Sequence, residues 1–171
     1  MKLQIRAWFW RFSAALIIRQ IVVSESAESN GLGDHIEWQP WSKGILSAKE
    51  SGKPIMVILH KSWCPACKAL KPKFEASKDI GQLSSHFVMI NAKEGEEPMD
   101  EPKLNIDGAY IPRVIFLDSE ANVLTDVFNE KGNPKYLYYH MDANSIADSM
   151  KKVLNIFKDT DTSEPIPSDE L

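Results

Sequence analysis

Residues 55–68 read IMVILHKSWCPACK and carry the strongest structural signal in the sequence. The first five of these residues are all apolar, and they follow a proline, Pro54, which blocks continuation of a preceding helix. A continuous apolar run of this length is typical of a strand that is buried on both faces of a sheet. We therefore predict a buried strand at residues 55–59 that leads directly into a pair of cysteines, Cys64 and Cys67.

Helix signals lie on both sides of this strand. Residues 42–51 predict a helix with Ser42 as its N-cap and Gly52 as its C-cap. Residues 64–77 place apolar side chains at helical spacing between lysines, so a helix should open at or just after Cys64, with a kink at Pro72. The final helix should follow an N-cap at Asp142, with its apolar face formed by Ile146, Met150, Val153, Leu154 and Phe157.

Further strands are predicted at residues 87–92, 114–118 and 123–128. The last two flank a polar turn and should form a hairpin. Between the first two lies an acidic, proline-containing stretch at 93–109, which lacks the ligand spacing of a calcium loop. We interpret it as a solvated connector in preference to a low-affinity calcium or client-binding loop.

Composition limits what the chain can be. Its 171 residues, 43% of them hydrophobic, suit one compact α/β domain at 31–157 with tails. The 24 acidic and 20 basic side chains give a net charge of −4, which argues against nucleic acid as a partner. With only two cysteines, the chain is not a disulfide-stapled scaffold, so its thiols are available for chemistry.

The two ends of the chain predict its compartment. Residues 1–26 have the basic start, apolar middle and small polar end of a signal peptide, an irregular one because Arg11 and Arg19 interrupt the apolar part. The same arginines disfavour a membrane anchor. A disordered extension is the alternative.

Residues 158–171 predict a flexible polar tail. The tail ends in Ser168, Asp169, Glu170 and Leu171, which resemble the KDEL and HDEL retrieval signals except at the first position. A solvated acidic tail is the alternative. Together the two ends indicate the lumen of the endoplasmic reticulum, with a retrieval receptor as a partner.

The cysteine spacing predicts thiol–disulfide exchange. A thiolate is the attacking species, and a helix amino terminus stabilises negative charge. Cys64 should therefore be the exposed nucleophile, and Cys67, one turn into the helix, the shielded thiol that resolves the mixed disulfide. A structural zinc site is disfavoured because it needs two further nitrogen or sulfur ligands, and the four histidines are scattered along the sequence. A purely structural disulfide is disfavoured because closing so short a loop yields little stabilising entropy.

These residues resemble the thioredoxin superfamily: a buried strand, then WCPACK, a helix containing a proline, and later YIPRVIFLD. The resemblance implies a single thioredoxin-like domain with a central mixed sheet flanked by helices. It also implies a cis proline at Pro112, after Ile111, facing the cysteines. Trp63 and Ile111 match positions that contact the client, and for Trp63, which would cover the attacking cysteine, ordinary core packing is the alternative.

The chain is also similar to the small endoplasmic-reticulum family of thioredoxin domain-containing protein 12 and the anterior gradient proteins, through GDHIEW, HKSWCPACKALKPKF, HFVMINA and GNPKYLYY. In that family, members with both cysteines are protein-disulfide oxidoreductases, and anterior gradient proteins carry serine at the second position. Cys67 therefore favours the enzymatic branch. The resemblance implies glutathione as redox co-substrate, cysteine-containing secretory proteins as clients, and neither a bound cofactor nor a metal. A chaperone-like module that binds clients without catalysis is the alternative.

One position departs from the superfamily. Its members carry a buried acid six residues before the first cysteine, where this chain has Ile58. Side chains alternate along a strand, so His60 should share a face with Ile58 and lie nearer the cysteines. We predict that His60 accepts the proton of the second thiol in place of this acid, and a packing role is the alternative. Tyr136, Tyr138 and Tyr139 are interpreted as a packed loop over the final helix in preference to a client surface.

Overall fold

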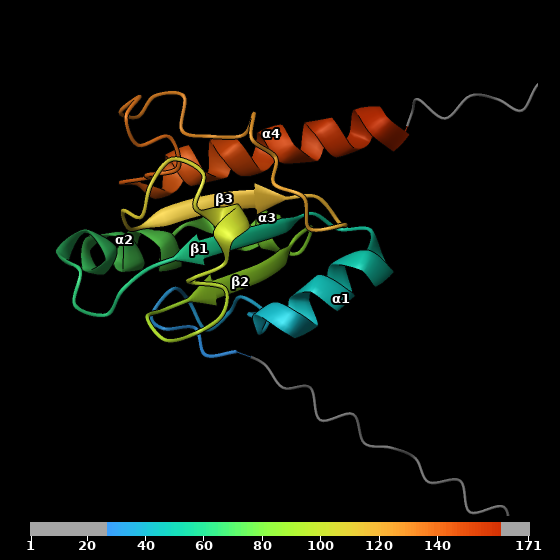
Figure 1. Cartoon of the computed structure of the whole chain (residues 1–171). Helices are drawn as coiled ribbons and strands as arrows, with labels where there is room; N and C mark the ends of the chain where they lie inside the picture. Colours follow the sequence, from blue (N-terminus) through green and yellow to red (C-terminus); the bar gives the residue numbers. More distant parts are fainter. Residues whose placement is uncertain (1–26, 162–171) are drawn as a thin grey trace, which may run out of the picture.

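A computed structural model describes residues 27–161. The predicted signal peptide at 1–26 and the retrieval signal Ser168–Leu171 lie outside the described residues. The elements, in chain order, are α1 (Trp41–Ser51), β1 (Ile55–Leu59), α2 (Pro65–Glu75), α3 (Lys78–Ser84), β2 (Val88–Ala92), the short 3-10 helix η1 (Pro102–Leu104), β3 (Arg113–Leu117) and α4 (Ala143–Asp161) (Figure 1).

The three strands form one mixed sheet in the order β2-β1-β3. The central strand β1 pairs in parallel with β2 and antiparallel with β3, and Ile58 lies opposite Asn91 on one side and Val114 on the other. All five residues of each strand are buried, as the apolar runs predict. The end of β1 therefore lies beside the end of β2 and the start of β3, so residues after β1 meet the segment that precedes β3.

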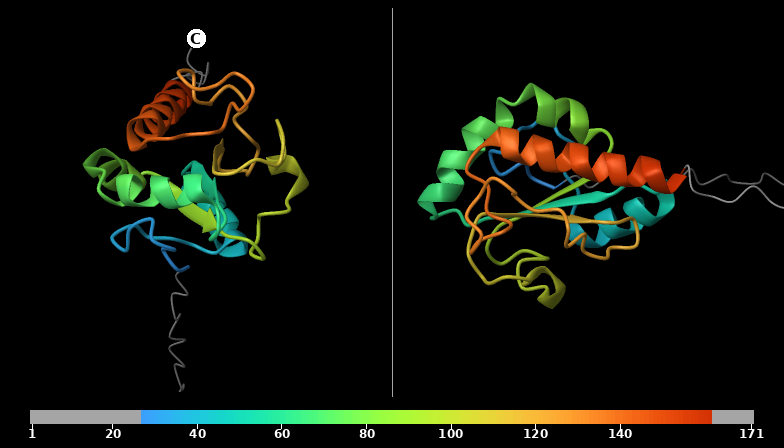
Figure 2. Two further views of the ribbon diagram at one scale, coloured as in Figure 1. Left: turned by 90° about the vertical axis from the view of Figure 1, so that its left-hand side faces the viewer. Right: turned by 90° about the horizontal axis from the view of Figure 1, so that it is seen from above.

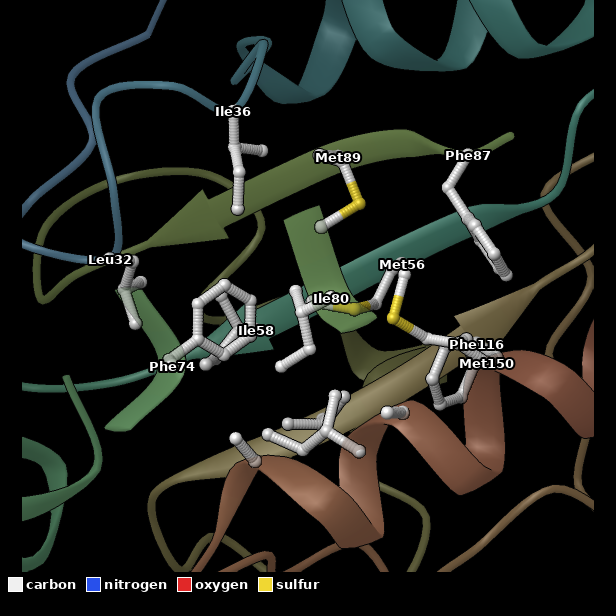
Figure 3. Close-up of a cluster of buried hydrophobic side chains, with 14 of the residues drawn as sticks. Leu32, Ile36, Met56, Ile58, Phe74, Ile80, Phe87, Met89, Phe116 and Met150 are labelled. Carbon is white, nitrogen blue, oxygen red and sulfur yellow. The ribbon is translucent and has the colours of Figure 1, made fainter. Parts of the chain in front are cut away.

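Side chains on the two faces of the sheet form two separate cores. On one face, Met56, Ile58 and Phe116 pack against α2, α3, α4 and the segment before α1, as Figure 3 shows. On the other face, Val57 and Ile115 pack against α1 and the 93–109 segment. The right-hand view of Figure 2 shows the sheet nearly edge-on, with α2, α3 and α4 on one side and α1 on the other. The predicted α/β fold with a central mixed sheet and flanking helices is confirmed.

The predicted hairpin partner at 123–128 is wrong as a strand. The turn itself forms, because the Asp118 N–H donates to the Asn122 carbonyl at 2.9 Å, but Val123 makes only an isolated bridge to Leu117. The chain then turns back on itself, and the Val127 N–H donates to the Leu124 carbonyl. After Val123, hydrogen bonds within a local turn thus replace the hydrogen bonds between strands.

Helix ends agree with the sequence in part. Gly52 ends α1 with a left-handed conformation (φ 69°), as predicted, but the helix starts at Trp41, one residue earlier than expected. Ser42 therefore lies inside the helix, and its predicted role as N-cap is wrong. Asp142 caps α4 as predicted, because its Oδ1 accepts the Ser145 N–H at 2.9 Å.

Helix α4 continues to Asp161, four residues beyond the predicted end of the domain at 157. Its buried residues include Ile146, Met150 and Val153, which belong to the predicted apolar face. Within residues 27–161, no helix combines the length and apolarity needed to cross a membrane.

Candidate active site

The two cysteines lie where β1 passes into α2. Cys64 is the N-cap residue of α2, and Pro65 occupies the first helical position, where a missing N–H costs nothing. The Cys67 N–H donates to the Cys64 sulfur at 3.3 Å, and the Lys68 N–H donates to the Cys64 carbonyl at 3.0 Å. The helix amino terminus thus presents a backbone N–H donor to this sulfur.

Burial separates the two thiols, both of which are free. Cys67 is 1% exposed and Cys64 is 7% exposed, so Cys64 is the more open of the two. The prediction that Cys64 is exposed is nevertheless wrong, because its sulfur is enclosed between the start of α2 and the Ile111 carbonyl oxygen, 4.0 Å away. Burial, followed by the hydrogen bond with Cys64, raises the pKa of the Cys67 thiol to about 12, although the Lys61 backbone N–H acts in the opposite direction.

The segment before β3 completes the site. The Ile111–Pro112 peptide bond is cis, as the resemblance implies. Pro112 is buried and Ile111 is half-buried. The predicted nucleophile and the predicted client-contacting segment are therefore brought together, although they are 47 residues apart in the chain.

Trp63 projects from the turn just before Cys64. Its side chain is 63% exposed, and the Lys61 Nζ lies 5.2 Å from its ring centre. An indole this exposed is not part of the core. Its predicted role in client contact stays a prediction.

His60 is buried at the end of β1, and its polar contacts favour one tautomer. The Asn91 amide nitrogen donates to the Glu28 carbonyl, and the Asn91 Oδ1 accepts from the Asn30 side chain at 2.7 Å. The His60 Nε2 lies 3.5 Å from that same acceptor oxygen, a contact that favours the tautomer with the hydrogen on Nε2. The His60 Nδ1 then presents a lone pair that has no hydrogen-bond partner among the described residues.

The environment of His60 keeps the ring neutral. Burial, with Lys71 as the next contribution, lowers the pKa of His60. Within residues 27–161, no hydrogen bond joins His60 to either sulfur, so a direct proton transfer to it is not built into this conformation. Its role as proton acceptor stays a prediction.

Residues 37–119 match a family model described as thioredoxin-like. Anterior gradient protein 2-B of Xenopus laevis is 34% identical over 148 residues, which span 86% of this chain and 88% of that protein. The human anterior gradient protein 2 homolog is 36% identical over 76% of this chain and 73% of its own length. The chain belongs to the anterior gradient family of thioredoxin-like proteins.

Solved structures agree on the fold of this anterior gradient family member. A thioredoxin from Thermus thermophilus superposes with a TM-score of 0.51 at 16% identity, over 70% of this chain and 88% of that one. The first thioredoxin domain of mouse protein disulfide-isomerase A4 gives 0.50 at 14% identity, over 86% and 88%. At these identities the likeness establishes the thioredoxin fold.

Two supporting residues of this family member escaped the sequence analysis. Glu94 accepts the Ser62 N–H at 2.9 Å and also its hydroxyl, and these bonds lower the pKa of Glu94 to about 2. The acidic 93–109 stretch is therefore more than a solvated connector, because one of its carboxylates fastens the turn that carries Trp63. No signal distinguishes Glu94 from its acidic neighbours in the sequence.

No group of three metal-ligating side chains is found within residues 27–161.

Arg113 is the second supporting residue. It is buried directly after Pro112, and its Nη1 donates to the carbonyls of Leu104 and Gly108, both at 2.7 Å. Burial lowers the pKa of Arg113, and the two carbonyl acceptors compensate part of the lost hydration. These bonds hold the segment before β3 in place beside Cys64. The sequence signal that could have identified Arg113 is its position as a charged residue at the start of an otherwise apolar strand.

Proposed function

We propose that this chain is a protein thiol–disulfide oxidoreductase that acts on cysteine-containing secretory proteins, with glutathione as its redox co-substrate. One observation carries the proposal: the Cys64 sulfur at the start of α2 receives a backbone N–H, faces the segment of the cis Pro112, and has the buried Cys67 one turn behind it. The thioredoxin fold supports it, because the pair occupies the strand-to-helix junction of that fold.

Exchange follows from the two unequal thiols. The Cys64 thiolate attacks one sulfur of a client disulfide, forms a mixed disulfide, and releases the other client sulfur as a thiolate. Cys67 then loses its proton and attacks the Cys64 sulfur, which frees the client thiol and leaves a Cys64–Cys67 disulfide. Two electrons pass to the client, and two glutathione thiols return the pair to its reduced form as oxidised glutathione is produced. The reverse sequence oxidises a client dithiol.

Turnover separates this function from the chaperone-like alternative. With a disulfide-bonded protein and excess reduced glutathione, one enzyme molecule should convert many client molecules. A module that only binds clients would show no catalytic turnover, and its affinity for unfolded chain would survive replacement of both cysteines. The decisive measurement is the number of client disulfides reduced per protein molecule, corrected for the reaction with glutathione alone.

The resolving step provides a test of His60. Because burial holds the pKa of Cys67 at about 12, this thiol is protonated near neutral pH, and its attack requires a proton acceptor. We propose His60 as this acceptor, because its ring is neutral and its Nδ1 lone pair has no hydrogen-bond partner among residues 27–161. We expect His60→Leu to slow resolution of the mixed disulfide about tenfold, with a smaller effect on attack by Cys64. This is less than the roughly 100- to 10,000-fold usual for general acid–base catalysis, because no hydrogen bond joins His60 to either sulfur in the described part of the chain.

The His60 experiment measures the two steps by stopped-flow and acid quench. His86→Leu, at an exposed histidine, is the matched control and should change neither rate. The free energy of unfolding of each variant separates chemistry from folding. Equal slowing of both steps, or none, assigns His60 to packing.

The proposed compartment is the lumen of the endoplasmic reticulum, and the support is the pair of terminal signals. Deletion of Ser168–Leu171 should send folded, active protein into the medium, because a retrieval receptor then has nothing to bind. Ser168→Lys should increase retention, since it restores the commoner first residue. The measurement is the ratio of secreted to retained protein for the three forms. An unchanged ratio after deletion would contradict retrieval by this tail.

A further inference from the structure

An open pocket of about 510 Å³ is lined in part by Ile111, the residue before the cis Pro112. Three segments line it: the residues before β3, the loop at 129–139, and the residues just before α4. Ile111 belongs to both the pocket and the candidate active site, because it lines the pocket and its carbonyl oxygen lies 4.0 Å from the Cys64 sulfur. In Figure 1 these segments gather at the end of the sheet where α2 begins. The pocket thus shares Ile111 with the candidate active site.

Aromatic and apolar side chains dominate this pocket, which we call the tyrosine pocket: Tyr110, Ile111, Tyr136, Tyr139 and Met141. The Tyr110 ring meets Tyr136 and Tyr139 edge-on, with ring centres 4.9 and 6.5 Å away. Met141 is 64% exposed and Tyr136 is 45% exposed, whereas Tyr138 points away into the core. The three tyrosines of the 129–139 loop therefore differ in burial. The prediction that they form one packed loop is wrong for Tyr136, which is exposed. Grouped exposed apolar side chains mark a binding surface.

Hydrogen bonds fix the walls of the tyrosine pocket. The Tyr110 hydroxyl donates to the Asp107 carboxylate and accepts the Tyr138 N–H at 2.9 Å. The same Asp107 oxygen accepts the Leu137 N–H at 2.8 Å. Burial, followed by the bond to Asp107, raises the pKa of Tyr110, so the hydroxyl keeps its proton.

The 129–139 loop is also closed on itself. The Asn129 N–H donates to the Leu137 carbonyl at 2.9 Å, and the Asn129 side chain donates to the Tyr139 carbonyl at 2.8 Å. These bonds join the two ends of the loop, as in compact surface loops that carry function. A pocket with fixed walls needs little ordering when a ligand binds.

We propose that the tyrosine pocket binds one aromatic or large aliphatic side chain of the client polypeptide, close in sequence to the client cysteine that reacts. This inference rests on the proposed function, because a client sulfur that reaches Cys64 brings its own chain past Ile111. Lys131 and Asp142 place charges of both signs at the lining, so the pocket gives no advantage to a client side chain of either charge. The client is therefore selected by an apolar side chain, and the chemistry at Cys64 is separate from that choice.

The test uses peptides with a single cysteine, joined by a disulfide to a small thiol. One phenylalanine or one alanine is moved through the positions on either side of the cysteine, and kcat/KM is measured for each peptide. At the best position, phenylalanine should exceed alanine about tenfold, which is less than full burial of an aromatic side chain gives because the pocket is open. The same peptides with serine in place of cysteine should show a similar ratio of Kd values by calorimetry.

The double variant Tyr136→Ser, Met141→Lys should bring both ratios close to one. Both side chains are exposed, and an unchanged urea midpoint shows that the variant is folded. Leu46→Lys, at an equally exposed leucine on α1, is the control and should keep the preference. Each ratio compares two peptides with the same protein, so a general change in thiol reactivity cancels.

The outcomes separate the two proposals. Turnover without a preference for phenylalanine, or a preference that survives in the double variant, overturns the tyrosine pocket and leaves the oxidoreductase proposal standing. A preference in Kd with no turnover of any peptide overturns the oxidoreductase proposal, and the pocket is then a binding site for polypeptide alone.

Discussion

Cys64→Ser should abolish disulfide exchange, and Cys67→Ser should trap clients as mixed disulfides. A serine hydroxyl at position 64 does not attack disulfides, so turnover should fall to the rate of glutathione alone. In Cys67→Ser the attack by Cys64 is preserved but the resolving thiol is missing, and one client should accumulate on each protein molecule. Non-reducing electrophoresis and intact mass spectrometry measure the adduct.

A matched control for both variants is Ala69→Ser, which introduces the same side chain at an exposed position of α2. It should keep wild-type turnover and form no stable adduct. In the wild type, alkylation near neutral pH should modify Cys64 first, because burial raises the pKa of Cys67 to about 12 and keeps it a thiol. Mixed disulfides that form through Cys67 when Cys64 is replaced would reverse the assigned roles.

Among these substitutions, Phe74→Ala should lower the free energy of unfolding the most. Phe74 is fully buried on α2 in the core that Figure 3 shows, and its ring centre lies 6.0 Å from that of Trp38. Truncation of a buried phenylalanine removes apolar contact and leaves a cavity, at a cost of about 3–5 kcal/mol in the free energy of unfolding. Typical domains have only about 5–15 kcal/mol in total. The urea midpoint should fall accordingly.

For comparison, Leu46→Ala removes an apolar side chain that is 61% exposed, and its effect should stay within about 0.5 kcal/mol. Equal effects of the two substitutions would show that the Phe74 side of the sheet is not tightly packed. Loss of Phe74 should also reduce exchange at temperatures where the variant is partly unfolded, since α2 carries both cysteines.

The parts of the fold that the sequence predicted correctly are those where one local signal decides the structure. The five apolar residues of β1 and the Asp142 cap of α4 are examples. Helix α3 was missed because its seven residues are too few for a clear apolar period, although Ser77 caps it. The strand at 123–128 failed because its apolar content reflects packing against the cores, whereas the turn around Val127 depends on tertiary context.

The candidate site divides in the same way. The cysteine pair and Pro112 each follow from a short motif of consecutive residues, WCPACK for the cysteines and YIPRVIFLD for the proline. The contacts of Glu94 with Ser62 and of Arg113 with Leu104 join residues whose meeting depends on how loops cross the end of the sheet. The exposure of Cys64 was overestimated for the same reason, because the carbonyl that covers it comes from Ile111.

The hydrogen bonds that close the 129–139 loop have a consequence for how such proteins diversify. The loop is fastened through backbone groups and the Asn129 side chain, so its exposed residues at 130–136 can be exchanged while the buried Tyr138 and the cysteines at the start of α2 stay in place. Recognition and reactivity can then change by separate mutations. A protein engineer could graft a different loop between Asn129 and Leu137 and redirect the choice of client while the redox pair stays as it is.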